Sequence, residues 1–173
     1  RIVPTEYSDL YGELIRGYVH DENAHSLGGV AGHAGLFSTA GDLAIFSQMM
    51  LNGGIYGWKR IFKEETIKLF TSRANIVEGS PRSLGWYSPE GKASGGVYLS
   101  DGSFGHTGYT GTSLWIDPEN DMFVILLTNA VHPDRLWKDP KYFDWRQRIH
   151  SEVYEAVGIT EKNPNLDWRK KWK

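Results

Sequence analysis

The spacing of apolar residues changes along the chain from a helical period to the alternation typical of strands. In residues 36–83, apolar side chains such as Leu43 and Phe46 recur three or four positions apart, which predicts helices. In residues 84–129, short apolar runs alternate with turn residues, which predicts antiparallel strands. The helical period returns in residues 141–159. This order predicts an α+β fold with an antiparallel sheet flanked by helices.

Local signals indicate where three helices begin and end. Thr39 and Asp42 have the spacing of a capping box, and residues 52–54 (Asn-Gly-Gly) end the helix that follows. A second helix is expected from about residue 63 to residue 72, and a terminal helix is expected over residues 144–157.

Five strands are expected between the second helix and the terminal helix. They are residues 84–87, 97–99, 104–107, 111–116 and 122–129, with a polar turn at residues 117–121. Because residues 122–129 are apolar at nearly every position, this strand is expected to be buried on both faces, as a central strand is.

The two ends of the chain are less regular. Glycines and Pro4 make residues 1–35 loop-rich. The charged tail of residues 160–173 carries Trp168 and Trp172, which either dock on the body or mark the surface of a partner. Since the chain begins without Met, we expect that a leader or a whole upstream region has been removed.

A dense polar cluster, His20-Asp21-Glu22-Asn23, interrupts the loop-rich N-terminal segment. Such a cluster either binds a metal or a substrate, or forms a turn whose side chains are solvated. Adjacent His and Asp side chains seldom point the same way, so the solvated turn is the favoured interpretation.

Composition excludes several classes of protein. A chain of 173 residues is long enough for one domain with a core. Its net charge of −2 gives no electrostatic case for nucleic acid or an anionic membrane. With no cysteine, disulfides and cysteine-based zinc sites are excluded, and no metal or other cofactor is predicted. No apolar run approaches the 18 residues of a transmembrane segment.

The most unusual stretch is the predicted strand at residues 104–107 with the loop behind it. Glycines at 105, 108 and 111 flank His106 and Thr107. Because glycine within a strand marks a bulge or a close approach, this strand face is interpreted as kept bare for a ligand. His106 and Thr107 would be its polar contacts. A glycine-rich hairpin with a solvated histidine is an alternative of about equal weight.

No complete catalytic set accompanies this strand. The sequence has no Gly-x-Ser-x-Gly elbow, no His-Glu-x-x-His, no phosphate-binding Gly-x-x-x-x-Gly-Lys, and no Ser or Thr three residues before a Lys. By its own residues, the chain therefore has a plausible binding strand without a recognisable nucleophile.

The tripeptide His106-Thr107-Gly108 resembles the third motif of the serine β-lactamase and penicillin-binding-protein superfamily, which is Lys-Thr-Gly in many members and His-Thr-Gly in some DD-peptidases. Residues 32–43 resemble the loop-to-helix segment of its class C-like branch, and residues 105–129 resemble the final strands of that branch. The resemblance covers roughly residues 18–160 and implies a β-lactamase/transpeptidase-like fold.

The resemblance also implies that residues 1–173 are a single partial domain, the C-terminal portion of the fold. The family's Ser-x-x-Lys and Tyr-x-Asn motifs would lie upstream, so the isolated chain is expected to be inactive. Tyr7-Ser8-Asp9 is similar to the second motif but is interpreted as a decoy, because too little chain separates it from residues 32–35. An extracytoplasmic location, in the periplasm or cell envelope, is implied by the family alone.

The family likeness assigns roles to the residues around the motif. An acyl-enzyme route needs an oxyanion hole built from backbone N–H groups, and the resemblance gives one of these to Tyr109. His106 and Thr107 would hold a substrate carboxylate or tune proton transfer. Histidine in place of lysine makes this positive charge depend on pH near neutrality. The remaining expectations concern substrate contacts, which are assigned to Gly108, Thr110 and Gly111, and the rim of the site, which is assigned to Asp21, Glu22 and Asn23.

Three hypotheses on function remain open from the sequence. The first is a fragment of a serine hydrolase that acts on D-Ala-D-Ala-like peptides, β-lactams or esters. The second is a non-catalytic module of the same fold that binds peptide or cell-wall ligands. The third is an unrelated α+β binding protein whose sheet is complete. Under the first two, missing strands leave an apolar edge, so the chain should need its N-terminal half or a homo-oligomer partner.

Overall fold

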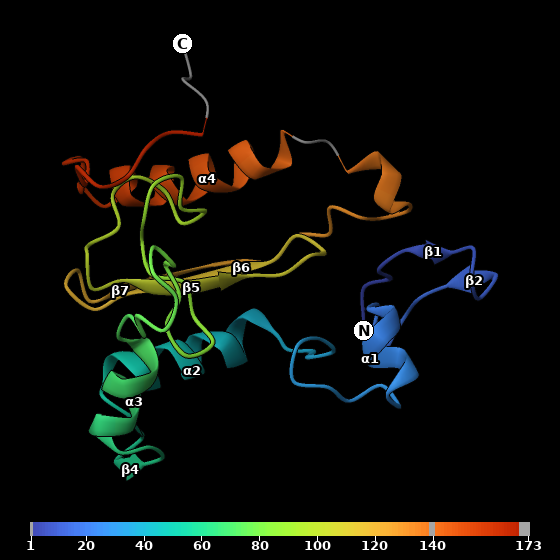
Figure 1. Ribbon diagram of the computed structural model, residues 1–173, viewed down its shortest axis with the longest axis horizontal. Coiled ribbons are helices and arrows are strands. Elements are labelled where there is room, and N and C mark those ends of the chain that lie inside the picture. The colour runs from blue at the N-terminus through green and yellow to red at the C-terminus, as the bar shows by residue number, and fades with distance from the viewer. Residues whose placement is uncertain (1, 139–140, 170–173) are drawn as a thin grey trace.

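A three-stranded antiparallel sheet forms the middle layer of the protein (Figure 1). The structure, a computed structural model, describes residues 2–138 and 141–169. The strands are β5 (Phe104–Thr107), β6 (Ser113–Asp117) and β7 (Met122–Leu126), in that order. Helix α4 (Tyr142–Ala156) covers one face and helix α2 (Ala40–Leu51) covers the other.

The alternation of side chains along the strands divides the core between the two faces. Trp115 pairs with Val124 across the sheet, and both pack under α4 with Tyr154. Ile116, the next residue of β6, packs on the opposite face with Phe104, Met49, Met50 and Ile67. Because successive residues of a strand point to opposite faces, one short strand serves both cores.

The three predicted helices are confirmed. Thr39 caps α2, and its Oγ1 accepts a hydrogen bond from the Asp42 N–H at 3.2 Å. Helix α3 (Glu64–Thr71) and α4 lie within two residues of their predicted limits. A small hairpin between α2 and α3, made of β3 (Ile55–Tyr56) and β4 (Lys59–Arg60), was not predicted.

Two of the five predicted strands are wrong. Residues 84–87 contribute only isolated bridges from Tyr87, to Arg82 and to Gly105, and residues 97–99 form no strand although Val97 and Leu99 are fully buried. The Val97 N–H donates to Ser151 Oγ at 3.3 Å, and the Leu99 carbonyl accepts from the Asn163 side chain. The side chains of Ser151 and Asn163, which are distant in sequence, therefore satisfy these two backbone groups. Residues 97–99 need no hydrogen-bonded neighbouring strand for them.

Strand β7 is an edge strand in the described sheet, because β6 is its only strand partner there. Val124 is buried, whereas Phe123 and Ile125 are partly exposed. The expectation that residues 122–129 are buried on both faces is therefore wrong for this chain. Strand β6 begins two residues later than predicted, since Gly111 and Thr112 belong to the loop.

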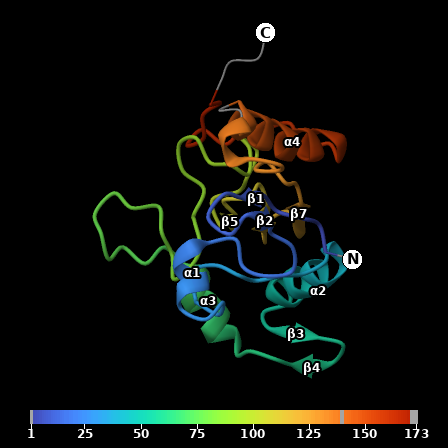
Figure 2. The same ribbon diagram turned by 90° about the vertical axis from the view of Figure 1, so that its right-hand side faces the viewer.

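The N-terminal segment, residues 2–35, lies beside the ends of the sheet and outside the three layers (Figure 1). It contains a hairpin of β1 (Tyr7–Ser8) and β2 (Glu13–Leu14), followed by helix α1 (Glu22–Ser26). Seen from the end of the molecule in Figure 2, its β1–β2 hairpin stands in front of the sheet, and α1 lies at about the level of α2. The segment is loop-rich as predicted, with these short elements added.

The C-terminal tail returns to the body. Leu166 is fully buried in the core under α4, and Trp168 packs against that core, so of the two proposed roles for Trp168 docking is confirmed. Trp172 and the rest of residues 170–173 lie outside the described residues. Among the residues that are described, no helix is both long and apolar enough to span a membrane.

Candidate active site around the His-Thr-Gly motif

The three glycines around the motif are explained by close internal packing. A Cβ added at Gly105 would lie 2.3 Å from the Trp115 ring, and one at Gly108 would lie 2.3 Å from Thr112 Oγ1. Gly111 has a φ of +128°, a conformation that L side chains rarely adopt. Packing within the sheet and loop is thus a sufficient reason for these glycines, and a strand face kept bare for a ligand stays a prediction.

Hydrogen bonds at both ring nitrogens favour the neutral form of His106. Nδ1 donates to the Thr107 carbonyl at 2.8 Å, and Nε2 accepts from Arg82 Nη1 at 3.0 Å. Burial, together with the positive charge of Arg82, lowers the pKa of His106 below its ordinary value. The expected pH-dependent charge on His106 is therefore replaced by the permanent charge of Arg82.

Tyr87 completes a small cluster with Arg82 and His106. The Arg82 guanidinium lies 3.5 Å from the centroid of the Tyr87 ring and also donates to the Tyr87 hydroxyl. The Tyr87 and His106 rings stack with their centroids 4.9 Å apart. Because Tyr87 is joined to Gly105 by two backbone hydrogen bonds, the cluster is fixed to the edge of β5. Sequence reasoning missed Arg82 and Tyr87 as site residues, because Arg82 lies in a polar loop without a periodic pattern and Tyr87 is assigned only to a predicted strand.

Every carbonyl of the loop after the motif accepts a hydrogen bond. Residues 108–111 are called the glycine loop here. Each of the four accepts at least one hydrogen bond from residues 128–146: Gly108 from Arg146, Tyr109 from Lys138, Thr110 from the Ala130 N–H, and Gly111 from Thr128 and Tyr142. The Gly108 carbonyl also accepts from the Gly111 N–H within the loop, at 3.2 Å. The distances from the Lys138 ammonium and the Ala130 N–H to their acceptors are 2.6 and 2.7 Å. The orientation of each peptide plane in the loop is thereby set.

This orientation decides where the Tyr109 N–H points. In a trans peptide the C=O and the next N–H are antiparallel. Since the Gly108 carbonyl faces Arg146 of α4 at 3.3 Å, the Tyr109 N–H faces the opposite side. No acceptor for this N–H is found in the described part of the chain. In this arrangement the Tyr109 N–H can donate a hydrogen bond to an oxygen of a ligand.

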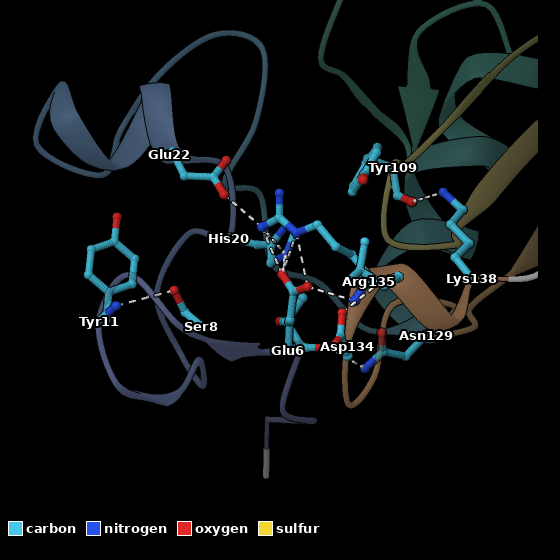
Figure 3. A network of polar contacts seen from close by, with 12 residues as sticks. Glu6, Ser8, Tyr11, His20, Glu22, Tyr109, Asn129, Asp134, Arg135 and Lys138 are labelled. Atoms are coloured by element: carbon cyan, nitrogen blue, oxygen red, sulfur yellow. Dashed lines mark hydrogen bonds and ion pairs between the residues drawn. The ribbon is translucent and has the colours of Figure 1, made fainter.

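The rim of the site is formed by a polar network that joins the N-terminal segment to residues 129–138 (Figure 3). Glu6 accepts hydrogen bonds from His20 and Arg135, and Arg135 also contacts Glu22 at 2.6 Å. The His20 ring stacks on the Tyr109 ring with the centroids 6.0 Å apart. Residue 20 of the predicted polar cluster is thereby brought to the glycine loop.

Glu22 of the predicted cluster joins this network through Arg135, whereas Asp21 and Asn23 lie outside it. Asp21 caps α1 by accepting from the Ala24 N–H at 2.8 Å, and it also contacts His33 at 2.9 Å. Asn23 is exposed on α1. Among the described residues, no group of three or more His, Cys, Asp or Glu side chains could hold a metal ion. Of the alternatives left open by the sequence, a metal cluster at residues 20–23 thus receives no support.

The chain is similar to known proteins both through a family model and through individual relatives. A family model described as Beta-lactamase matches residues 5–147. A protein of Escherichia coli (strain K12) named "Putative D-alanyl-D-alanine carboxypeptidase" is 47% identical over 131 residues, which cover 73% of this chain and 30% of that protein. A protein of the same name from Salmonella newport (strain SL254) matches with the same identity and coverage.

A solved structure described as "Crystal structure of putative beta-lactamase from Bacteroides dorei DSM 17855" has 16% sequence identity with this chain and a TM-score of 0.44. The match covers 75% of this chain and 45% of that chain. The matched segment therefore spans less than half of the solved chain and less than a third of the curated relatives.

Proposed function

Because this chain belongs to the beta-lactamase family, a family of serine hydrolases with an α+β fold, we propose that it is the C-terminal portion of a hydrolase that works through an acyl-enzyme. Its substrates would be D-Ala-D-Ala-like peptides, β-lactams or related esters that carry a carboxylate. The nucleophilic serine and its lysine would lie upstream, so residues 1–173 alone would be inactive. Family membership excludes the hypothesis of an unrelated binding protein.

The orientation of the Tyr109 N–H supports the acyl-enzyme route. When a serine attacks a carbonyl carbon, negative charge develops on the carbonyl oxygen, and fixed N–H donors stabilise it. Tyr109 would supply one such donor, and the N–H of the serine would supply the other. Because the glycine-loop carbonyls are already bound, the donor would need no reorganisation during the reaction.

The Arg82–His106 pair beside Thr107 is the observation that supports a substrate with a carboxylate. A guanidinium keeps its charge at all physiological pH values and binds carboxylates strongly. With His106 neutral, Arg82 would provide the attraction for a substrate carboxylate, and Thr107 and Thr110 would provide hydroxyl contacts. Gly108 and Gly111 would bring backbone atoms close to the substrate, as the sequence predicts.

The edge of the sheet supports the proposal that upstream residues complete the domain. Phe123 and Ile125 of β7 are partly exposed, and an unpaired apolar edge is a template for another strand. We propose that strands from the N-terminal half of the catalytic domain cover it, and that a second copy of this chain would do so in their absence. An extracytoplasmic location would follow from the likeness to D-alanyl-D-alanine carboxypeptidases by name.

The test is labelling with a fluorescent penicillin, followed by intact mass. Two proteins are compared: this chain and the longer natural protein that contains it. We expect one acyl group on the longer protein and none on residues 1–173. Labelling of the short chain would place the nucleophile within it and overturn the proposal. Absence of label and of esterase activity in the longer protein would favour the non-catalytic binding module instead.

The role of Arg82 is tested in the same longer protein with Arg82→Gln. We expect acylation by penicillin, which bears a carboxylate, to slow by about tenfold or more. Hydrolysis of an uncharged ester should change little. Arg73→Gln is the matched control, because Arg73 pairs with Glu90 at the surface whereas Arg82 pairs with His106. If the reactions of both substrates slow equally, Arg82 does not contribute to recognition of the carboxylate.

A further inference from the structure

One buried carboxylate, that of Glu6, is the centre of the network at the rim of the site (Figure 3). Glu6 is 3% exposed, and both of its oxygens are occupied. Oε2 accepts from His20 Nε2 at 2.5 Å, and Oε1 accepts from the backbone N–H of Arg135 at 2.7 Å. The Arg135 Nε lies 2.9 Å from each oxygen. We name Glu6, His20 and Arg135 the Glu6 clasp.

The charge balance of the clasp favours an ionised Glu6. Burial alone would raise the pKa of Glu6, but the hydrogen bonds from Arg135 and His20 outweigh it and lower the pKa to about 2. Removing one partner from such a buried pair leaves an uncompensated group and is strongly destabilising. The clasp is therefore expected to be intact whenever the segment is docked.

The first arm of the clasp reaches the backbone of Tyr109. Arg135 is the first residue of the 3-10 turn η1 (Arg135–Trp137), which Asp134 caps through the Leu136 N–H. Lys138 follows this turn directly, and its Nζ donates to the Tyr109 carbonyl at 2.6 Å. Fixing Arg135 on Glu6 thus fixes the turn from which Lys138 reaches the glycine loop.

The second arm reaches the side chain of Tyr109. His20 is bound to Glu6 through Nε2, and its ring stacks on the Tyr109 ring at an interplanar angle of 21°. Lys138 Nζ lies 4.3 Å from the centroid of the same ring. Although Tyr109 is 60% exposed, its ring and its carbonyl are both held by groups that depend on Glu6.

Hydrogen bonds to backbone carbonyls also join the two chain segments at this point. Asn129 Nδ2 donates to the Pro4 carbonyl at 2.6 Å, and the Tyr7 N–H donates to the Pro133 carbonyl at 2.7 Å. These contacts are enough to tether the segment. The ion pairs of Glu6 add a fixed geometry, because an Arg–carboxylate pair is directional whereas a tether is not.

We propose that Glu6, His20 and Arg135 are positioning residues that hold Tyr109, and with it the backbone N–H that would face the substrate, in its reactive orientation. The consequence for catalysis rests on the proposed function. The consequence for the order of the glycine loop does not. The clasp therefore makes residues 2–35 part of the site, although none of its side chains touches the His-Thr-Gly motif.

The first arm of the test measures the loop in this chain by amide hydrogen exchange. The reporters are the Gly111 N–H, which donates to Gly108 O, and the Ala130 N–H, which donates to Thr110 O. In Glu6→Gln we expect both to exchange about tenfold faster or more, while the amides of β6 keep their rates. His20→Leu, which leaves the Arg135 pair intact, should give a smaller increase. Unchanged reporters in both variants would overturn the proposal.

The second arm measures acylation by fluorescent penicillin in the longer protein. Glu6→Gln should slow acylation by about tenfold or more, because a displaced donor loses its alignment with the oxyanion. Glu90→Gln is the matched control, since Glu90 pairs with Arg73 at the surface. A looser loop with an unchanged acylation rate would overturn the positioning role. If the unmodified protein is not acylated, the proposed function fails, and the exchange rates alone decide whether the clasp orders the loop.

Discussion

The body of the protein and its N-terminal segment are held together by different forces. In the body, meaning the sheet with α2 and α4, residues such as Trp115, Ile116 and Tyr154 are at most 2% exposed. In residues 2–35, Leu10 and Val30 are 72% and 90% exposed, and the attachments to the body are polar. A small set of buried apolar residues in this segment comprises Ile15, Val19 and Ala24.

The interactions that stabilise the fold are therefore different from the interactions that orient the groups of the candidate site. Burial of apolar area is large and non-directional, so it stabilises the layers without specifying the orientation of a single group. Hydrogen bonds and ion pairs are individually weaker but directional. The candidate site lies where the two regions meet, and it takes its rigidity from the body and its orientation from the polar contacts.

The largest effect is expected in the body. Trp115→Ala removes a ring that is 2% exposed and packs against Gly95 and Gly105. We expect a loss of about 3–5 kcal/mol in the free energy of unfolding, measured by denaturant titration. The matched control is Trp58→Ala, because Trp58 is fully exposed on the β3–β4 hairpin. If both variants lose the same stability, the body is not held by the core under α4.

The pH dependence of the body gives the next effect. Fully buried His150 shares a hydrogen bond with Ser113, with 2.8 Å between Nε2 and Oγ, and burial together with the charge of Arg146 lowers its pKa from 6.5 to about 4. The unfolded chain therefore binds a proton more readily than the folded one between these values. The stability that His150 contributes is complete above pH 6.5 and falls by roughly 3 kcal/mol as the pH falls to about 4.

Denaturant titrations from pH 7 to pH 4 would measure this loss. His150→Gln, which keeps a hydrogen-bonding group opposite Ser113, should flatten the curve over that range. The stability that Glu6 contributes is lost at lower pH than that of His150. It falls as the pH drops from about 4.5 toward 2, because the pKa of Glu6 is lowered from 4.5 to about 2. A curve that is equally steep in His150→Gln would show that other groups carry the pH dependence.

A smaller effect is expected from the clasp, measured locally in the N-terminal segment. Glu6→Gln should destabilise the docked segment by about 2 kcal/mol, because Arg135 loses the charge of its buried partner. Glu6→Leu combined with Arg135→Met should cost less than either single change, since no charge is then left unpaired. Exchange of the Thr5 and Ile15 amides, which pair within this segment, gives the local stability. Additive costs would show that the pair is not coupled.

The sequence predicts the helices well and the strands unevenly. Residues 39–52 carry both periodicity and end signals, and residues 144–157 carry periodicity; both kinds of signal are local properties. Residues 97–99 have the apolar character of a strand, yet their backbone pairs with Ser151 and Asn163, and no short-range pattern reveals such partners. Likewise, β7 has the composition of a central strand, and under the proposed function the strands that would bury it come from upstream residues. The described chain supplies a partner on one side only.

In the candidate site, too, only the part that is contiguous in sequence could be predicted. The His106-Thr107-Gly108 motif is contiguous, so its family could be recognised from sequence. Its partners are not contiguous: Arg82 is 24 residues from His106, and Lys138 is 29 residues from Tyr109. Their roles depend on how the loops fold back on β5. The binding roles of Thr107, Thr110 and Gly111 stay predictions.

The contact between Glu6 and Arg135 also has a consequence for the order in which the molecule folds. The two residues are separated by 129 positions, so their pairing closes a loop that includes most of the chain. Closing so long a loop has a high entropic cost, and it gains its contacts only after the 3-10 turn and the glycine loop have formed. By contrast, β5, β6 and β7 are joined by short turns and pair locally. We therefore expect the rim to assemble last, so that the chain passes through a stage with a formed sheet and an unfinished site.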